Sequence, residues 1–259
     1  MAILPAVTSE DAIRGYYRAL LAAWGPQDWW PARTRFEVIV GAFLTQNTAW
    51  TNVEKALANL RRARVLSVEG IRRTPQRRLE RLIRPTGYFR QKAARLKNFV
   101  RHLDSRHQGS LARMLARPTA ELRAELLALN GVGPETADSI LLYAGGQASF
   151  VVDAYTRRIL ERHGVISAEA SYEEMREMFQ RSLNGEPAPS PLESPSGNWK
   201  PETGNSSLRS PKYLVPHASS AEQVYNEYHA LLVQVGKRHC LKARAMCTGC
   251  PLERFLPRV

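Results

Sequence analysis

Apolar residues recur at helical spacing along most of the chain. Between Tyr16 and Arg162 they return every three or four positions, the period of an amphipathic helix, and the alternation typical of a strand is absent. The clearest sets are Phe36, Ile39, Val40, Phe43 and Leu44, and then Val53, Ala56, Leu57 and Leu60. The pattern predicts an all-α protein.

Helix boundaries are indicated by capping residues. Thr34, with Glu37 three residues later, has the spacing of a capping box, and Thr119 after Pro118 is a second candidate N-cap. The later helices are expected to be Ala120–Leu129, Glu135–Tyr143 and Ala221–Gly236.

One segment lacks this pattern. Residues 184–220 hold seven of the sixteen prolines together with many Ser, Gly and Asn, and have almost no apolar periodicity. A helix with an apolar stripe resumes after the segment, which therefore interrupts a fold and does not end it. We expect a disordered insertion over 184–220, exposed on the surface.

Composition adds size and charge to this picture. The 259 residues, 44% of them hydrophobic, suffice for one large domain or two small ones. Lys and Arg outnumber Asp and Glu by 37 to 24, and the net charge of +13 favours a polyanionic partner, with nucleic acid as the first candidate. A basic protein without such a partner is the alternative. No apolar run of about 18 residues and no secretory leader is recognised, so a cytoplasmic location is expected, at the nucleoid in a bacterium.

The sharpest local motif is Leu129-Asn130-Gly131-Val132-Gly133-Pro134, which lies between two predicted helices. Glycines at such a corner leave the backbone unshielded, so N–H groups at the start of the second helix can approach a phosphate. Gly131, Val132 and Gly133 are therefore candidate DNA-binding residues. An ordinary tight turn with a glycine cap is the alternative.

A second motif follows shortly after the first: Val151-Val152-Asp153-Ala154-Tyr155-Thr156-Arg157-Arg158. An Asp at the head of a helix is most often an N-cap. The two motifs together, however, resemble the endonuclease III-type helix-hairpin-helix DNA glycosylases, in which the hairpin is followed by a catalytic Asp in a Val-Asp-x-x-x-x-Arg setting. Leu44-Thr45-Gln46-Asn47-Thr48 and Arg84-Pro85-Thr86-Gly87-Tyr88-Phe89-Arg90-Gln91-Lys92-Ala93 are similar to further signatures of that family.

The resemblance covers about Trp29–Gly164 and Tyr225–Pro251, and is closest to the 3-methyladenine DNA glycosylase branch. It implies two lobes: a six-helix barrel over 34–145 that contains the hairpin, and a second lobe made from 1–33 and 146–259. A monomer would bind damaged duplex DNA between the lobes, with Asp153 as the catalytic residue. Gln46 would lie near the gap left by the flipped base, with simple packing as its alternative role.

One departure from the family concerns the reaction. Members that also cut the strand have a lysine at the second position after the hairpin's last glycine, and its amine forms a Schiff base with the sugar. Here that position is Glu135, which cannot form an imine. We expect a glycosylase without lyase activity, unless another lysine, Lys92 or Lys97, replaces the missing one.

Tryptophans indicate the substrate. Trp29, Trp30 and Trp50 stand at two loci that the resemblance places near the base pocket. Indole faces attract cations, so these residues favour a cationic alkylated purine, although packing inside the protein is the alternative role for large aromatics. Such a base is already a good leaving group, and the enzyme then needs mainly an anion, Asp153, to stabilise the developing positive charge on the sugar.

Three cysteines lie close together near the C-terminus. Cys240, Cys247 and Cys250 have C-x6-C-x2-C spacing, which resembles the first three ligands of the family's [4Fe-4S] loop, here over 240–256. The fourth ligand position is Leu256. A labile or three-iron cluster, a substitute ligand such as His239, and no cluster at all are the alternatives.

The leading hypothesis is a monofunctional base excision repair glycosylase for alkylated purines. An endonuclease III-like glycosylase for oxidised pyrimidines and a non-catalytic DNA-binding module are the other two candidates.

Overall fold

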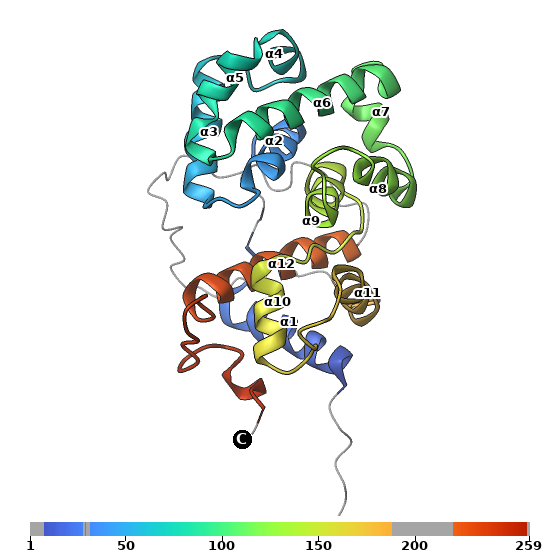
Figure 1. Cartoon of the computed structure of the whole chain (residues 1–259). Helices are drawn as coiled ribbons and strands as arrows, with labels where there is room; N and C mark the ends of the chain where they lie inside the picture. Colours follow the sequence, from blue (N-terminus) through green and yellow to red (C-terminus); the bar gives the residue numbers. More distant parts are fainter. Residues whose placement is uncertain (1–7, 28, 30–31, 188–219, 258–259) are drawn as a thin grey trace, which may run out of the picture. The chain divides into compact units, whose positions relative to one another are not determined.

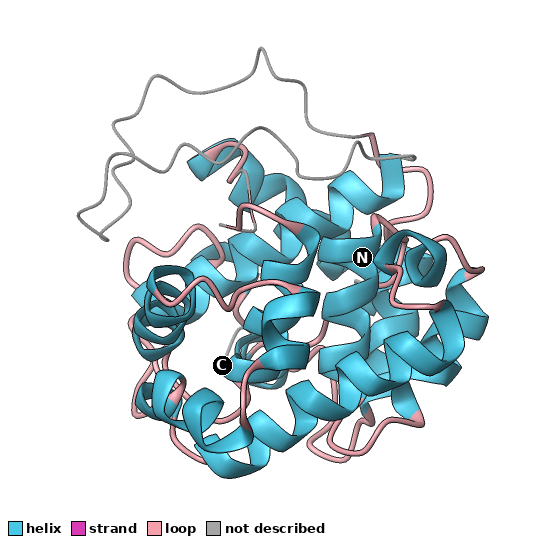
Figure 2. Ribbon diagram, turned by 90° about the horizontal axis from the view of Figure 1, so that it is seen from above, coloured by secondary structure: helices cyan, strands magenta, loops and turns pink. Residues whose placement is uncertain are grey.

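The structure is a computed structural model of the chain, which describes residues 8–27, 29, 32–187 and 220–257. These residues form helices joined by turns and loops, with no strand among them beyond one isolated bridge between Cys240 and Ala245 (Figures 1 and 2). The predicted all-α class is confirmed. Within the described part, no helix is long and apolar enough to cross a membrane.

The described chain divides into two compact units. One contains residues 8–27, 29, 148–187 and 220–257, and thus joins both ends of the chain. The other contains residues 32–147, an uninterrupted stretch. We call them the terminal unit and the central unit. The sequence had predicted lobe boundaries at 33/34 and 145/146.

The central unit is built around a buried helix. Its helices are α2 (Arg35–Thr45), α3 (Trp50–Arg62), α4 (Val68–Arg73), α5 (Gln76–Leu82), α6 (Phe89–His107), α7 (Leu111–Leu115), α8 (Thr119–Leu127) and α9 (Pro134–Ser139), which continues as a π-helical turn, η2 (Ile140–Gly145). Every residue from Phe36 to Leu44 is buried, because α2 packs against α3, α6, α9 and η2. A helix that is apolar on all sides is typical of such a central position. Helix α6 runs alongside α4 and α5 and leads to α7 (Figure 1).

One predicted N-cap is confirmed and the other is wrong. The Thr34 hydroxyl accepts a hydrogen bond from the Glu37 backbone N–H at 3.1 Å, at the start of α2. By contrast, α8 begins at Thr119 itself, after Pro118, and no side chain caps it. The fixed backbone of a proline suits the turn into a helix without a capping hydroxyl. The helix accordingly starts one residue earlier than expected.

The terminal unit is held together by an aromatic core. It consists of α1 (Ser9–Trp24), α10 (Ala154–Arg162), α11 (Tyr172–Ser182) and α12 (Ser220–Arg238). Phe150 and Phe179 stack with ring centroids 4.0 Å apart, and Tyr228 of α12 packs edge-on against both rings. Helices α10 and α12 also approach closely at Gly236, where a Cβ atom would lie 2.1 Å from the Tyr155 ring. Only glycine allows this contact.

The first residues of the predicted insertion are folded. Glu186, inside the predicted range 184–220, is only 7% exposed, and its carboxylate pairs with Arg18 of α1 at 2.6 Å. Residues 184–187 therefore belong to the folded terminal unit. Positions 188–219 lie outside the described residues.

Candidate functional site

The hairpin loop of the central unit has the backbone features that the sequence predicted. Gly131 has φ +82°, a conformation that side chains disfavour, and Val132 is buried as an anchor. Gly133 is exposed at the N-cap position of α9, with no side-chain cap and no atom within 4 Å of where a Cβ would lie. The first N–H groups of α9 are therefore open to an approaching group.

A buried ion pair fixes the two hairpin helices relative to each other. Arg123 of α8 donates two hydrogen bonds, of 2.7 and 3.0 Å, to the carboxylate of Asp138 on α9. Asp138 is fully buried. Removing one partner of such a pair would leave the other charge buried without a counter-charge, which is strongly destabilising. The pair therefore holds α8 and α9 in one relative orientation. The sequence pattern did not reveal it.

Gln46 contacts the hairpin directly. Its amide donates to the Gly131 carbonyl at 2.9 Å and to the Thr136 hydroxyl at 3.0 Å, and its carbonyl accepts from Arg95 of α6. Arg95 also lies against Gly131, where a Cβ would meet its Nε at 2.1 Å. Gln46 and Arg95 thus support the loop, and the placement of Gln46 near the gap left by a flipped base stays a prediction.

Glu135 stands in the first turn of α9, with its side chain exposed. The amines of the two alternative lysines both donate hydrogen bonds to backbone carbonyls. Lys92 is buried and its Nζ donates to the Leu44 and Thr86 carbonyls at 2.9 and 2.8 Å. Lys97 Nζ donates to the Arg72 carbonyl at 3.0 Å.

The amine of Lys92 has unusual electrostatics. Burial, and to a lesser extent the charge of Arg95, lower the pKa of Lys92 to about 8. Nucleophilic lysines have a lowered pKa, but the Lys92 amine is enclosed and donates hydrogen bonds to two backbone carbonyls, so it is not open to a substrate. Its contacts fit a structural role in joining the end of α2 to η1 (Arg84–Thr86).

Asp153 begins α10 in the terminal unit. Its Oδ1 accepts the Thr156 backbone N–H at 2.8 Å, so the residue is an N-cap, as its position predicted. Its Oδ2 lies 3.5 Å from Nε2 of His229 on α12. Burial raises the pKa of Asp153, but the hydrogen bond and charge of His229, with the Thr156 N–H, lower it further than burial raises it. The side chain is therefore an ionised carboxylate in a largely enclosed position.

His229 was missed by sequence reasoning. It lies 76 positions after Asp153, on the helix beyond the predicted insertion, and its side chain is buried. A lone histidine on an apolar helix is usually a core residue, so no local pattern distinguished it. Only the packing of α10 against α12 brings it to the carboxylate.

The predicted tryptophans fall in different places. Trp29 is in the terminal unit, and Lys237 of α12 lies 5.7 Å from the centre of its ring, a cation–π contact. Trp50 is the first residue of α3 in the central unit and is partly buried. Trp30 lies outside the described residues.

The cysteine loop follows α12 and is anchored to α10. Arg158 donates to the Cys240 carbonyl at 2.8 Å, and Arg162 Nη1 lies 3.3 Å from Cys240 Sγ. Three cysteines supply three of the four thiolates that a cubane cluster usually takes.

The fourth ligand position of the loop is Leu256, which offers no donor. The ring of His239 stacks on Trp24, and its Nδ1 lies 3.2 Å from the Met246 carbonyl. The described donor set therefore fits a four-iron cluster incompletely.

Comparisons with known proteins agree on one group of enzymes. Residues 40–184 match the HhH-GPD superfamily of base excision DNA repair proteins. The chain is 42% identical over 247 residues to a Methanocaldococcus jannaschii protein named as a DNA repair glycosylase, covering 95% of this chain and 96% of that protein. It is 28% identical over 228 residues to the endonuclease III-like protein 1 of Bos taurus, which covers 87% of this chain and 59% of that protein.

Solved structures give the same result for the fold. The 3-methyladenine DNA glycosylase of H. pylori, bound to 1,N6-ethenoadenine, superposes with a TM-score of 0.67 and 28% identity, over 89% of this chain and 98% of that one. A trapped covalent complex of endonuclease III with DNA superposes with a TM-score of 0.68 and 19% identity, over 95% and 94% of the two chains. The second similarity establishes the fold alone.

Proposed function

This chain belongs to the HhH-GPD superfamily of base excision DNA repair proteins and is a DNA glycosylase, and we propose that it hydrolyses the N-glycosidic bond of alkylated purines without cutting the DNA strand. The observation that carries the proposal is Asp153, a largely enclosed carboxylate whose pKa is held below its usual value by His229 and the Thr156 N–H. An enclosed anion of this kind suits a reaction that develops positive charge.

The proposed reaction uses that anion at the sugar. As the bond to the base breaks, positive charge develops on the deoxyribose ring, and the Asp153 carboxylate stabilises it and orients the attacking water. Because an alkylated purine already carries positive charge, it leaves without much help from a general acid. The nucleophile is water, since Glu135 stands where the resemblance places a lysine and the amine of Lys92 is buried.

The hairpin loop supports the proposal that the partner is duplex DNA. The open N–H groups at the start of α9 and the exposed Gly133 suit a phosphate contact. Such contacts position a protein on DNA without reading the sequence. The net charge of +13 adds a general attraction to the phosphate backbone. We propose that one monomer binds one damaged site.

One comparison supports alkylated purines as substrates. The Trp29 ring does not add to it, because the Lys237 amine already lies 5.7 Å from the ring centre. The H. pylori protein with which the chain shares 28% identity is named a 3-methyladenine glycosylase and was solved with a modified adenine. The similarity to endonuclease III-like proteins supports the second candidate, an enzyme for oxidised pyrimidines.

A panel of duplexes separates these candidates. Each duplex carries one lesion: 3-methyladenine, 1,N6-ethenoadenine or an oxidised pyrimidine, and base release is followed under single-turnover conditions. The proposal requires faster release of 3-methyladenine, which carries a positive charge, than of the oxidised pyrimidine. 1,N6-Ethenoadenine is uncharged, so its rate shows whether that charge is needed. Faster release of the oxidised pyrimidine would favour the second candidate, and DNA binding without release of any base would favour a non-catalytic module.

We infer that the cysteine loop binds iron only partially. Cys240, Cys247 and Cys250 supply three thiolates, and Leu256 leaves the fourth corner of a cubane without a protein ligand. Anaerobically purified protein should contain less than four iron ions per chain, and Leu256→Cys should raise both iron content and Tm, because a cluster bound only by the folded loop stabilises that fold. Four irons per chain in the unaltered protein would contradict the inference.

A further inference from the structure

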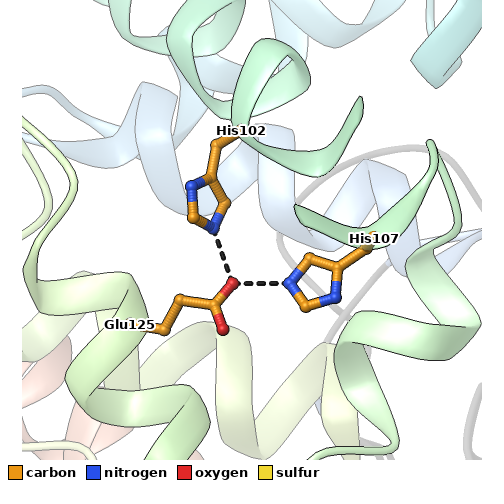
Figure 3. A group of neighbouring side chains, drawn as sticks. All are labelled: His102, His107 and Glu125. Atoms are coloured by element: carbon orange, nitrogen blue, oxygen red, sulfur yellow. Dashed lines mark hydrogen bonds and ion pairs between the residues drawn. The ribbon is translucent and has the colours of Figure 1, made fainter. Parts of the chain in front are cut away.

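Two histidines and a glutamate meet at one point in the central unit. His102 and His107 both belong to α6, and Glu125 belongs to α8. Both imidazole rings point at the same carboxylate oxygen, Oε1 of Glu125, with Nε2 to Oε1 distances of 2.6 and 2.5 Å (Figure 3). His107 and Glu125 are largely buried, with side-chain exposures of 5% and 15%.

The three donor atoms are arranged for a divalent ion. They all lie within 4.8 Å of one another. Zn²⁺ binds imidazole nitrogen and carboxylate oxygen at about 2.0–2.2 Å in a tetrahedron, so its donors stand about 3.4 Å apart. Moving the two imidazoles away from Oε1 by a little under 1 Å would make that spacing. The imidazole protons now occupy the place that the ion would take, since a carboxylate can only accept hydrogen bonds.

The cluster also has an open side. His102 and Glu125 line a pocket of about 380 Å³, together with Arg106, Arg117, Ala128 and Leu129. Two of the three candidate ligands therefore face this pocket, and a zinc ion with three protein ligands keeps a fourth position for water.

Arg117, at the edge of the pocket, approaches the other carboxylate oxygen of Glu125, so Oε1 stays available to an ion. Arg117 Nε lies 3.5 Å from Oε2 of Glu125, the oxygen that faces away from the histidines. Arg117 also pairs with Glu121 at 2.8 Å, so its charge is shared between two carboxylates.

We propose that His102, His107 and Glu125 form a zinc site that ties α6 to α8. Because α8 is the first helix of the hairpin, the ion would fix the hairpin to the rest of the central unit through α6. The proposal concerns metal binding alone and stands apart from the glycosylase activity. Metal-binding histidine pairs on a helix are recognised at a spacing of four, so the five-residue spacing of His102 and His107 forms no recognisable motif.

The test uses the full chain, stripped of metal with a chelator and then titrated with Zn²⁺ in a calorimeter and with Co²⁺ in a spectrophotometer. Co²⁺ at the cysteine loop gives thiolate-to-metal charge-transfer absorption, whereas Co²⁺ at His102, His107 and Glu125 gives tetrahedral d–d bands without it. His102→Gln removes the imidazole and keeps a hydrogen-bond donor toward Glu125. His163→Gln is the matched control, because His163 is a part-buried histidine of the terminal unit.

The parent and His163→Gln should bind one ion with thiolate-free bands, and Zn²⁺ should raise their Tm. His102→Gln should bind that ion at least about 100-fold more weakly, since even indirect changes around a ligand cost about 10–100-fold. Equal thiolate-free binding by the parent and His102→Gln, or none in the parent, would overturn the proposal. If His102→Gln does not fold, Glu125→Gln provides the same comparison.

Discussion

At the scale of single residues, Asp153 combines a structural and a chemical role. Its Oδ1 caps α10 and its Oδ2 faces His229, so the same side chain starts a helix and holds an enclosed negative charge. The position of Asp153 and its capping role could be predicted from the sequence, because both depend on neighbouring residues. His229 could not, because its contact with Asp153 depends on how α10 packs against α12.

Two substitutions separate the roles of Asp153. Asp153→Asn keeps a good N-cap and removes the charge, so folding and DNA affinity should change little while base release falls by at least about 100-fold. Asp153→Ala should be equally inactive and also lose about 1 kcal/mol of stability, because it removes the cap. Single-turnover assays and urea unfolding measure the two effects. Near-parental base release by Asp153→Asn would mean that Asp153 is only a cap.

The pH dependence of base release tests the pairing with His229. Because His229 lowers the pKa of Asp153, replacing it should raise that pKa. An Asp whose pKa is lowered by folding stabilises the folded state at pH values above its pKa in the unfolded chain, near 3.8. This stabilisation is lost as the pH falls through the lower pKa of the folded state. In His229→Gln, both base release and the acid stability of the protein should therefore be lost at a higher pH than in the parent. His163→Gln is the control for base release, and an unchanged acid limb of base release in His229→Gln would argue against the pairing.

At the scale of elements, the spacing of apolar residues predicted the helices. It predicted the helix boundaries and the contacts between helices only in part. Thr34 caps α2 as predicted, whereas α8 starts at Thr119 without a capping side chain. The hairpin loop was identified from its glycines. Its supports, the Arg123–Asp138 pair and the bonds of Gln46 to Gly131, connect separate helices and left no periodic signal in the sequence.

The two hairpin glycines should respond differently to alanine. Gly131→Ala places a Cβ at φ +82° against Arg95, so it should cost about 1–2 kcal/mol or more of stability. Gly133 has φ −94° and open space around its Cα, so Gly133→Ala should leave stability unchanged. The added methyl group should nevertheless weaken DNA binding, because it occupies the space where a phosphate would approach. Thermal unfolding and a DNA-binding titration give both quantities. Unchanged DNA affinity in Gly133→Ala would mean that the loop is only a turn.

At the scale of the whole molecule, composition predicted a basic protein and apolar spacing predicted an all-α one, and the described residues form two compact helical units. The 37 Lys and Arg side chains are not all free to meet DNA. Arg61 pairs with buried Glu37, Arg72 with Asp104 and Glu69, and Arg123 with Asp138. These pairs are invisible to a count of charges, because they join residues far apart in the sequence or on adjacent turns. The arginines left unpaired supply the general attraction to DNA.

The central claim, that this glycosylase removes an alkylated purine and leaves the strand intact, is tested most directly on an end-labelled duplex bearing one 3-methyladenine. The products are separated before and after hot alkali, and a parallel reaction contains borohydride. We predict release of the base, an intact strand until alkali is added and no trapped protein–DNA adduct, because Glu135 cannot form an imine. A nicked strand without alkali, a trapped adduct, or a base that stays attached would contradict the claim.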